Sequence, residues 1–201
     1  EMCIRDRFWK RHKNELKKKD YNEFYKTLSF DMEDPMDWMH TNAEGTLEYT
    51  LLFYIPKKAP MDMYRADYHP GVKLYVNKVF ITDDDKELLP TWLRFIKGVI
   101  DSSDLPLNVS REILQQNRVM AKIKSNAVKK ILDKFKSLAK NDKQYIEFYE
   151  QFGKLLKEGV YHIKDLNEGM KKILDTEFNC YTNCQDSNGL KNIIENDKKF
   201  L

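Results

Sequence analysis

A long helical pattern in the second half of the chain is the feature that most limits the fold. Between residues 111 and 141 apolar side chains recur at helical spacing, and neither proline nor glycine interrupts them. At 3.6 residues per turn, this stretch predicts a helix of about eight turns with one apolar face. That face is expected to consist of Leu114, Met120, Ile123, Ala127, Ile131, Phe135 and Leu138.

Three shorter stretches carry the same helical spacing. Residues 142–159 predict a further helix, with Gly159 as its C-cap. Residues 87–100 place leucine, tryptophan, phenylalanine, isoleucine and valine on one stripe, which predicts a helix there. Residues 20–30 predict a helix near the N-terminus, with Asp20 as its N-cap.

Strand patterns are confined to the first half of the chain. Residues 46–56 are β-prone and end at Pro56, which cannot donate to a strand ladder. Residues 72–81 begin with apolar and polar side chains in alternation, as expected for a strand with one buried face. Residues 31–45 and 57–71 are expected to be a turn-rich connection and a long loop. Strands followed by helices predict a mixed α/β fold, of the α+β kind, that continues into a helical segment.

Composition excludes several classes of protein. The 35 Lys and Arg residues nearly balance the 32 Asp and Glu residues, which argues against a nucleic-acid-binding surface. No apolar run approaches the roughly 20 residues that span a bilayer, and the first residues have no secretory signal pattern. Three scattered cysteines provide no disulfide framework. A reducing, intracellular location is the simplest interpretation.

No self-contained catalytic motif is visible. Cys180 and Cys184 lack the second pair that a structural zinc site needs, and we expect no metal there. The acidic run at residues 83–87 could bind a cation, but acids before a predicted helix more commonly cap it. There is no glycine-rich phosphate loop and no nucleophile motif.

Arg111 and Gln115 are the candidate functional pair. Spaced four residues apart at the start of the predicted long helix, they lie on one face. A helix N-terminus attracts anions, and an arginine there can bind a phosphate with two hydrogen bonds. The alternative is an ordinary pair of exposed polar side chains, and the two residues alone favour this alternative because exposed arginines are common.

Longer strings resemble a known family. The run "GVKLYVNKVFITDDDKELLPTWLRFIKGVIDSSDLPLNVSREILQQNRV", together with "EYTLLFYIPKKAP", "YNEFYK" and "FYEQFGKLLKEG", resembles the middle domain of the heat-shock protein 90 family. The bacterial high-temperature protein G branch is the most similar. The resemblance covers Trp9 to about Gly159, and it implies a three-layer αβα module followed by a helical segment.

The resemblance also implies a role in ATP hydrolysis. In this family the arginine and glutamine of the matching motif, here Arg111 and Gln115, reach the γ-phosphate of ATP bound with Mg in a separate N-terminal domain. Asn117 is a weaker candidate in the same segment. The chain itself is expected to bind no cofactor and not to hydrolyse ATP alone. The full-length protein is expected to be a cytoplasmic or organelle-matrix homodimeric chaperone.

A surface for unfolded client proteins and for neighbouring domains is implied as well. The family exposes apolar side chains near the loop at residues 57–64, which here contains Met61 and Met63. Trp9 matches an aromatic residue near the start of the family's middle domain. Each of these three side chains could instead belong to the core, and this alternative stays open.

The two ends of the chain fit the resemblance less well. Residues 1–7 are expected to be an artefactual or disordered leader, followed by an α/β subdomain at 8–110 and a helical segment at 111–159. Residues 160–201 match only loosely and are expected to be the damaged or truncated start of a second small α/β unit. A stand-alone adaptor module and a non-functional gene fragment are the alternatives to a chaperone segment.

Overall fold

A computed structural model describes residues 7–60, 63–65, 68, 71–83, 88–106 and 117–162, the side chains of residues 160–162 excepted. The chain divides into two compact units, residues 1–159 and 160–201. The described strands and helices belong to the first unit, apart from the last residues of the C-terminal helix.

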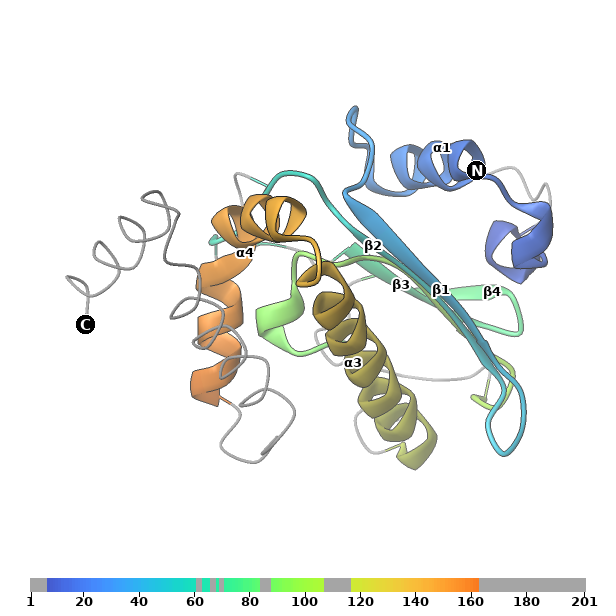
Figure 1. The fold of residues 1–201 in the computed structure, drawn as a ribbon. Coiled ribbons are helices and arrows are strands. Elements are labelled where there is room, and N and C mark those ends of the chain that lie inside the picture. The colour runs from blue at the N-terminus through green and yellow to red at the C-terminus, as the bar shows by residue number, and fades with distance from the viewer. Residues whose placement is uncertain are drawn as a thin grey trace, which may run out of the picture. The chain divides into compact units, whose positions relative to one another are not determined.

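A five-stranded sheet in the order β1-β2-β5-β3-β4 forms the centre of the first unit (Figure 1). β3 and β5 pair in parallel, and the other neighbours pair antiparallel. The internal strands β2 and β5 are almost entirely buried, because side chains cover both of their faces. The strands are β1 (Asp37–Ala43), β2 (Tyr49–Ile55), β3 (Gly71–Val76), β4 (Val79–Thr82) and β5 (Lys97–Ser102).

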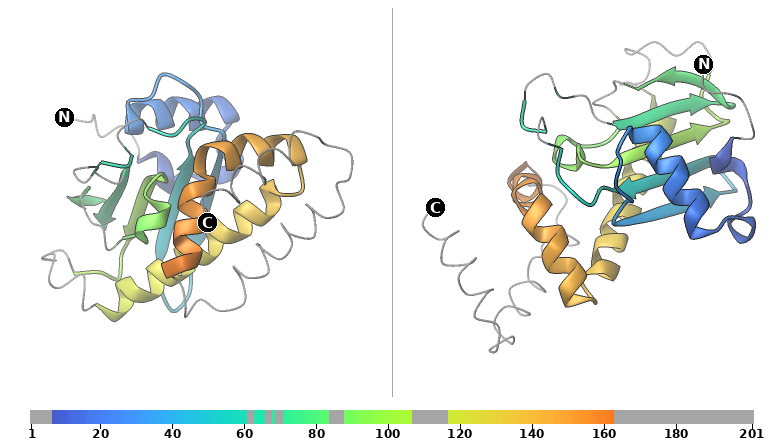
Figure 2. Two further views of the ribbon diagram at one scale, coloured as in Figure 1. Left: turned by 90° about the vertical axis from the view of Figure 1, so that its left-hand side faces the viewer. Right: turned by 90° about the horizontal axis from the view of Figure 1, so that it is seen from above.

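Helices cover the two faces of the sheet (Figure 2). One face carries α1 (Lys18–Ser29), and the other carries α3 (Arg118–Leu138) and the first-unit part of α4 (Asp142–His162). Short 3-10 turns are η1 (Phe8–Lys10), η2 (Lys13–Glu15) and η3 (Thr91–Leu93). The three-layer αβα arrangement predicted from the resemblance is therefore confirmed.

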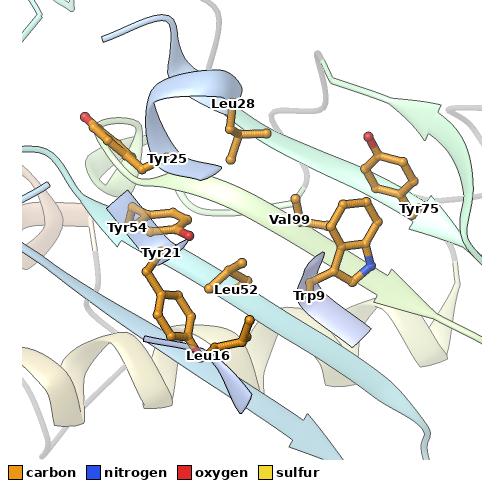
Figure 3. Packing of buried hydrophobic residues seen from close by; sticks show 9 residues of the cluster. All are labelled: Trp9, Leu16, Tyr21, Tyr25, Leu28, Leu52, Tyr54, Tyr75 and Val99. Atoms are coloured by element: carbon orange, nitrogen blue, oxygen red, sulfur yellow. The ribbon is translucent and has the colours of Figure 1, made fainter. Parts of the chain in front are cut away.

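Each face of the sheet has its own core. On the α1 face, aromatic and aliphatic side chains from η1, α1 and the sheet form one cluster: Trp9, Leu16, Tyr21, Tyr25, Leu28, Leu52, Tyr54, Tyr75 and Val99 (Figure 3). On the other face Phe95 stacks on Phe152 at 4.2 Å between ring centroids, and Phe135 contacts Phe148 at 4.9 Å. Successive residues of one strand serve different cores, because side chains alternate between the faces of a sheet.

The strand predictions are confirmed in part. β2 lies within the predicted stretch and ends at Ile55, immediately before Pro56. Val72, Leu74 and Val76 are buried as predicted. Residues 72–81 are not one strand, however, because Asn77 and Lys78 have φ angles of 47° and 68° and turn the chain back into β4. Two successive positive φ values are typical of a tight hairpin turn.

Two segments have a different structure from the one predicted. Residues 31–45 contain the edge strand β1, where only a connection was expected. The described part of the predicted helix at residues 87–100 is not a helix, because η3 is followed after three residues by β5. The apolar residues of that stretch are buried as a helical stripe would be, but β5 pairs with β2 on one side and β3 on the other. β-branched Val99 and Ile100 suit this internal strand.

The ends of the helices also differ from the predictions. α1 begins at Lys18, and Asp20 lies in its first turn, where its carboxylate accepts a hydrogen bond from the backbone N–H of Lys17 at 2.8 Å. Asn117 has extended backbone angles and caps α3, so one continuous helix through residues 111–141 is excluded. α4 continues past Gly159 to His162.

Candidate functional site

The described residues form a frame on both sides of the segment that carries Arg111 and Gln115. Arg111, Gln115 and Met61 lie outside the described residues. The segment of residues 107–116 follows Pro106, shortly after β5, and precedes Asn117, the cap of α3. The described residues on either side of the segment are the two arms of this frame.

The arm before the segment is bonded to Glu48, which immediately precedes β2. The backbone carbonyl of Glu48 accepts hydrogen bonds from the Ser102 hydroxyl at 3.1 Å and the Ser103 N–H at 3.2 Å. In the other direction, the Glu48 N–H donates to the Asp104 carboxylate at 2.6 Å. Residues 102–104, part of the sequence "DSSD", thus form a polar turn fixed to the sheet.

The arm after the segment is bonded to the neighbouring residue of β2. The Asn117 side chain accepts hydrogen bonds from the backbone N–H groups of Val119 at 2.8 Å and Met120 at 3.3 Å, which caps α3. Further along α3, the Asn126 amide donates to the Tyr49 hydroxyl at 3.0 Å. The first arm is therefore bonded to the residue before β2, and α3, which follows the second arm, is bonded to Tyr49 through Asn126. Asn117 has a structural role as a cap, and its contact with a nucleotide stays a prediction.

Asp101 is a fully buried carboxylate at the base of this frame. Its side chain is 0% exposed, a costly position for a charge unless hydrogen bonds and cations surround it. One oxygen accepts from the indole N–H of Trp9 at 2.8 Å and lies 3.6 Å from the Lys10 ammonium. The other accepts from the backbone N–H of Lys78 at 3.1 Å. Asp101 thereby joins η1, β5 and the β3–β4 turn.

His40 of β1 bonds to the backbone of the same tryptophan. Its Nε2 lies 2.8 Å from the Trp9 carbonyl oxygen, and its Nδ1 lies 2.9 Å from the Tyr21 hydroxyl. A carbonyl can only accept, so Nε2 carries the proton and donates, and Nδ1 accepts from Tyr21. Burial lowers the pKa of His40 below its ordinary value. A neutral imidazole therefore satisfies both partners.

The structure corrects the expectation that Trp9 and Met63 are exposed. Trp9 is 4% and Met63 1% exposed, which is the core alternative. Trp9 packs against Tyr75 at 4.6 Å between ring centroids (Figure 3). Met63 lines a cavity of about 290 Å³, where its backbone carbonyl accepts a hydrogen bond from Arg94 at 3.1 Å. Both residue types are apolar and common in cores, so sequence alone does not reveal which side of the surface they occupy.

Other apolar side chains are exposed instead, and the sequence patterns did not single them out. Phe30 is 87% and Met32 91% exposed in the turn after α1. Phe30 also has a left-handed backbone, with a φ angle of 58°. The remaining large exposed hydrophobic residues of the described ranges are Tyr64, Val79 and Phe80. An apolar residue beside a helix end and an Asp-Pro turn was the available signal for Phe30 and Met32.

The described ranges contain neither a cluster of metal ligands nor a membrane-spanning helix. No group of three or more His, Cys, Asp or Glu side chains is placed to hold a metal ion there. Among the helices of those ranges, none combines the length and apolar character needed to cross a membrane.

Comparisons with known proteins identify similar chains. A family model described as "Hsp90 protein" matches residues 4–200. "Chaperone protein HtpG" of Helicobacter hepaticus is 63% identical over 166 residues, which is 83% of this chain and 27% of the relative. The protein of the same name from Treponema denticola is 63% identical over 154 residues, covering 76% of this chain and 24% of the relative. The chain spans about a quarter of the length of these curated relatives.

A solved structure is similar in fold. It is the middle domain of a protein described as a heat shock protein from Plasmodium falciparum, with a TM-score of 0.68 and 30% sequence identity. The match covers 81% of this chain and 62% of that domain. The three-layer core with its five-stranded sheet is thus the fold of a known middle domain.

Proposed function

The chain belongs to the Hsp90 protein family, and on this premise we propose that it is the middle segment of an ATP-dependent molecular chaperone. It would supply Arg111 and Gln115 to ATP bound with Mg in an N-terminal domain of the same protein. It would also offer a surface to unfolded or partly folded clients. In the full-length protein, which we propose to be a homodimer, ATP hydrolysis would require the two domains to meet.

The frame around residues 107–116 carries this proposal. Residues 102–104 are bonded to Glu48 before the segment, and Asn117 caps α3 directly after it, so the chain is held by hydrogen bonds on both sides of the arginine-bearing segment. A segment anchored at both ends can present a side chain to a docked domain with little loss of conformational freedom.

Arg111 has the chemistry that the proposed role needs. Its guanidinium is always charged and can donate two parallel hydrogen bonds to phosphate oxygens. Placed against the transferring phosphoryl group, it would offset the charge that accumulates on those oxygens in the transition state. Gln115, four residues later in the sequence, would donate or accept a further hydrogen bond at the same phosphate or at a water molecule.

The test uses the full-length protein that contains this chain. We expect Arg111→Ala to lower the kcat of ATP hydrolysis by about 100-fold or more, since one such donor is commonly worth that much. The KM for ATP should change far less, because the N-terminal domain would hold most of the nucleotide. Gln115→Ala should lower kcat by a smaller factor.

Arg118→Ala is the matched control. Arg118 is an exposed arginine in the first turn of α3, close in sequence to Arg111 but beyond the Asn117 cap. Its replacement removes the same charge and should leave kcat unchanged. Equal kcat values for the Arg111→Ala variant and the unmodified protein would exclude the proposed role.

A further inference from the structure

We propose that Asp101 is a positioning residue for ATP hydrolysis: its buried carboxylate joins η1 to the end of β5, which leads to the segment that carries Arg111. This inference rests on the proposed function and extends it to a residue that does not touch the nucleotide. The observation that carries it is a fully buried charge whose partners come from two other segments of the chain.

The position of Asp101 in the sheet explains its partners. β5 pairs Asp101 with Thr50 of β2 and with Tyr75 of β3, so the residue lies in the middle of the sheet. Its side chain faces the same way as that of Val99, two residues earlier, which is the face covered by α1 and η1. An apolar residue would suit this packing, whereas a carboxylate there is costly unless it is fully bonded.

The partners of Asp101 satisfy that requirement. Trp9 donates its indole N–H, Lys78 donates its backbone N–H, and Lys10 supplies a positive charge. Lys10 also donates to the Thr50 hydroxyl at 3.2 Å, so η1 is bonded to two neighbouring strands. Because Lys78 belongs to the β3–β4 turn, loss of the carboxylate would loosen this turn together with η1.

Trp9 is fixed at its backbone as well as at its ring. His40 of β1 bonds the Trp9 carbonyl while Asp101 of β5 bonds its indole. Trp9 therefore connects an edge strand to an internal strand across the α1 face of the sheet. A displacement of η1 would act on β5 through the Trp9–Asp101 hydrogen bond and the Lys10–Asp101 ion pair.

The end of β5 is continuous with the arm that precedes Arg111. Ser102 follows Asp101 directly, and residues 102–104 are bonded to Glu48. With Asp101 in place, η1, the β3–β4 turn and this arm share one fixed point. Under the proposed role, a change at η1 would reach the arm before residue 107 through this shared point.

The experiment measures ATPase kinetics of the full-length protein with Trp9→Phe and, separately, Asp101→Asn. Trp9→Phe keeps an aromatic ring but removes the N–H donor, and Asp101→Asn keeps the size but removes the charge and one acceptor. We expect kcat to fall by about tenfold in each, since small misplacements of a reacting group can cost up to about 100-fold. The KM for ATP should stay within about twofold of the original value.

A double variant separates positioning from general damage. If Asp101 acts through Arg111, then Trp9→Phe added to Arg111→Ala should lower the residual kcat no further. An undiminished fall in that background would mean a merely structural role and would overturn the inference. Trp38→Phe is the control: Trp38 packs against the same cluster from β1, and its replacement should leave kcat unchanged.

The two proposals fail in different ways. Unchanged kcat in Arg111→Ala would remove the proposed function, and this inference with it. A large loss in Arg111→Ala together with unchanged kcat in both Trp9→Phe and Asp101→Asn would leave the function intact and overturn the positioning role of Asp101. Thermal unfolding of each variant, measured beside the kinetics, shows which of them are folded at the assay temperature.

Discussion

Gly153 and Gly159 both lie inside α4, but their surroundings differ. A Cβ atom at position 159 would lie 2.6 Å from Cδ2 of Trp92, a buried side chain of η3. At position 153 it would lie 3.1 Å from the ring of Tyr149, which is partly exposed. Packed interiors yield little, whereas an exposed ring can move. Gly159 thus permits a close approach of α4 to η3.

Gly159→Ala is therefore expected to destabilise the protein. The clash with Trp92 should lower the free energy of unfolding by about 1–3 kcal/mol, even though alanine favours a helix by about 1 kcal/mol. Gly153→Ala, the control in the same helix, should change it by less than about 1 kcal/mol. Urea unfolding of the two variants measures the difference. Equal stabilities would mean that η3 and α4 are not in this close contact.

Single residues show the limit of what the sequence could predict. Gly159 was expected to end a helix, because glycine is common after a helix end, and nothing local indicated that its missing Cβ accommodates Trp92. Asp101 was part of a recognised string, yet its burial depends on Trp9, far away in the sequence. Local patterns identify residue types, whereas such contacts arise only when distant segments meet.

At the scale of elements, His40 connects η1 and α1 to the edge strand β1. It bonds the Trp9 carbonyl of η1 and the Tyr21 hydroxyl of α1 and is buried between them. Burial lowers its pKa, so the folded state binds a proton less readily than the unfolded state. The contribution of neutral His40 to stability is complete above its unfolded pKa of about 6.5 and is lost as pH falls through the lower folded pKa.

Stability should consequently decrease as pH is lowered below about 6.5. Measurement of the free energy of unfolding from pH 7.5 to 5 should show a decrease that His40→Gln reduces, although this variant is less stable at pH 7.5. His12→Gln is the control, because it removes an imidazole from an exposed position outside the core. If His40→Gln retains the full slope, other groups cause the pH dependence.

The type of an element could be predicted where buried and exposed side chains recur with a regular period. It could not be predicted for β5 and β1, which lack such a period. α4 and the buried residues of β3 follow helical and alternating spacing. β5 is buried on both faces, so its apolar run has no strand period and resembled part of a helical stripe. β1 lies at the sheet edge and is only half-buried, with few apolar residues to reveal it. Both segments are strands because they pair with neighbouring strands of the sheet.

At the scale of the whole molecule, family membership and the three-layer core agree with the resemblance of the motifs. Long specific sequence strings indicate a family because they contain both core residues of the fold and candidate site residues. The same strings did not reveal which apolar side chains are exposed. Trp9 and Met63 were named for that surface and are buried, whereas Phe30 and Met32 are the most exposed large hydrophobic residues among the described ones.

Phe30 is unfavourable for folding in two ways. Its left-handed backbone at the C-terminus of α1 suits glycine or asparagine, and for other residues it costs about 1–2 kcal/mol. Its ring is 87% exposed and so gains almost nothing from burial. Met32 extends the apolar area on the same turn. Under the proposed chaperone function, this exposed apolar turn would contact clients, and that use would offset its cost to stability.

Phe30→Asn should therefore separate stability from chaperone activity. We expect the free energy of unfolding of the full-length protein's middle segment to rise by about 1 kcal/mol, because asparagine tolerates the left-handed backbone. Suppression of aggregation of a heat-denatured client, followed by light scattering, should become weaker because an aromatic contact is lost. Phe30→Tyr keeps both the strain and the ring and should change neither property. A Phe30→Asn variant that is more stable and suppresses aggregation equally well would show that Phe30 makes no contact with clients.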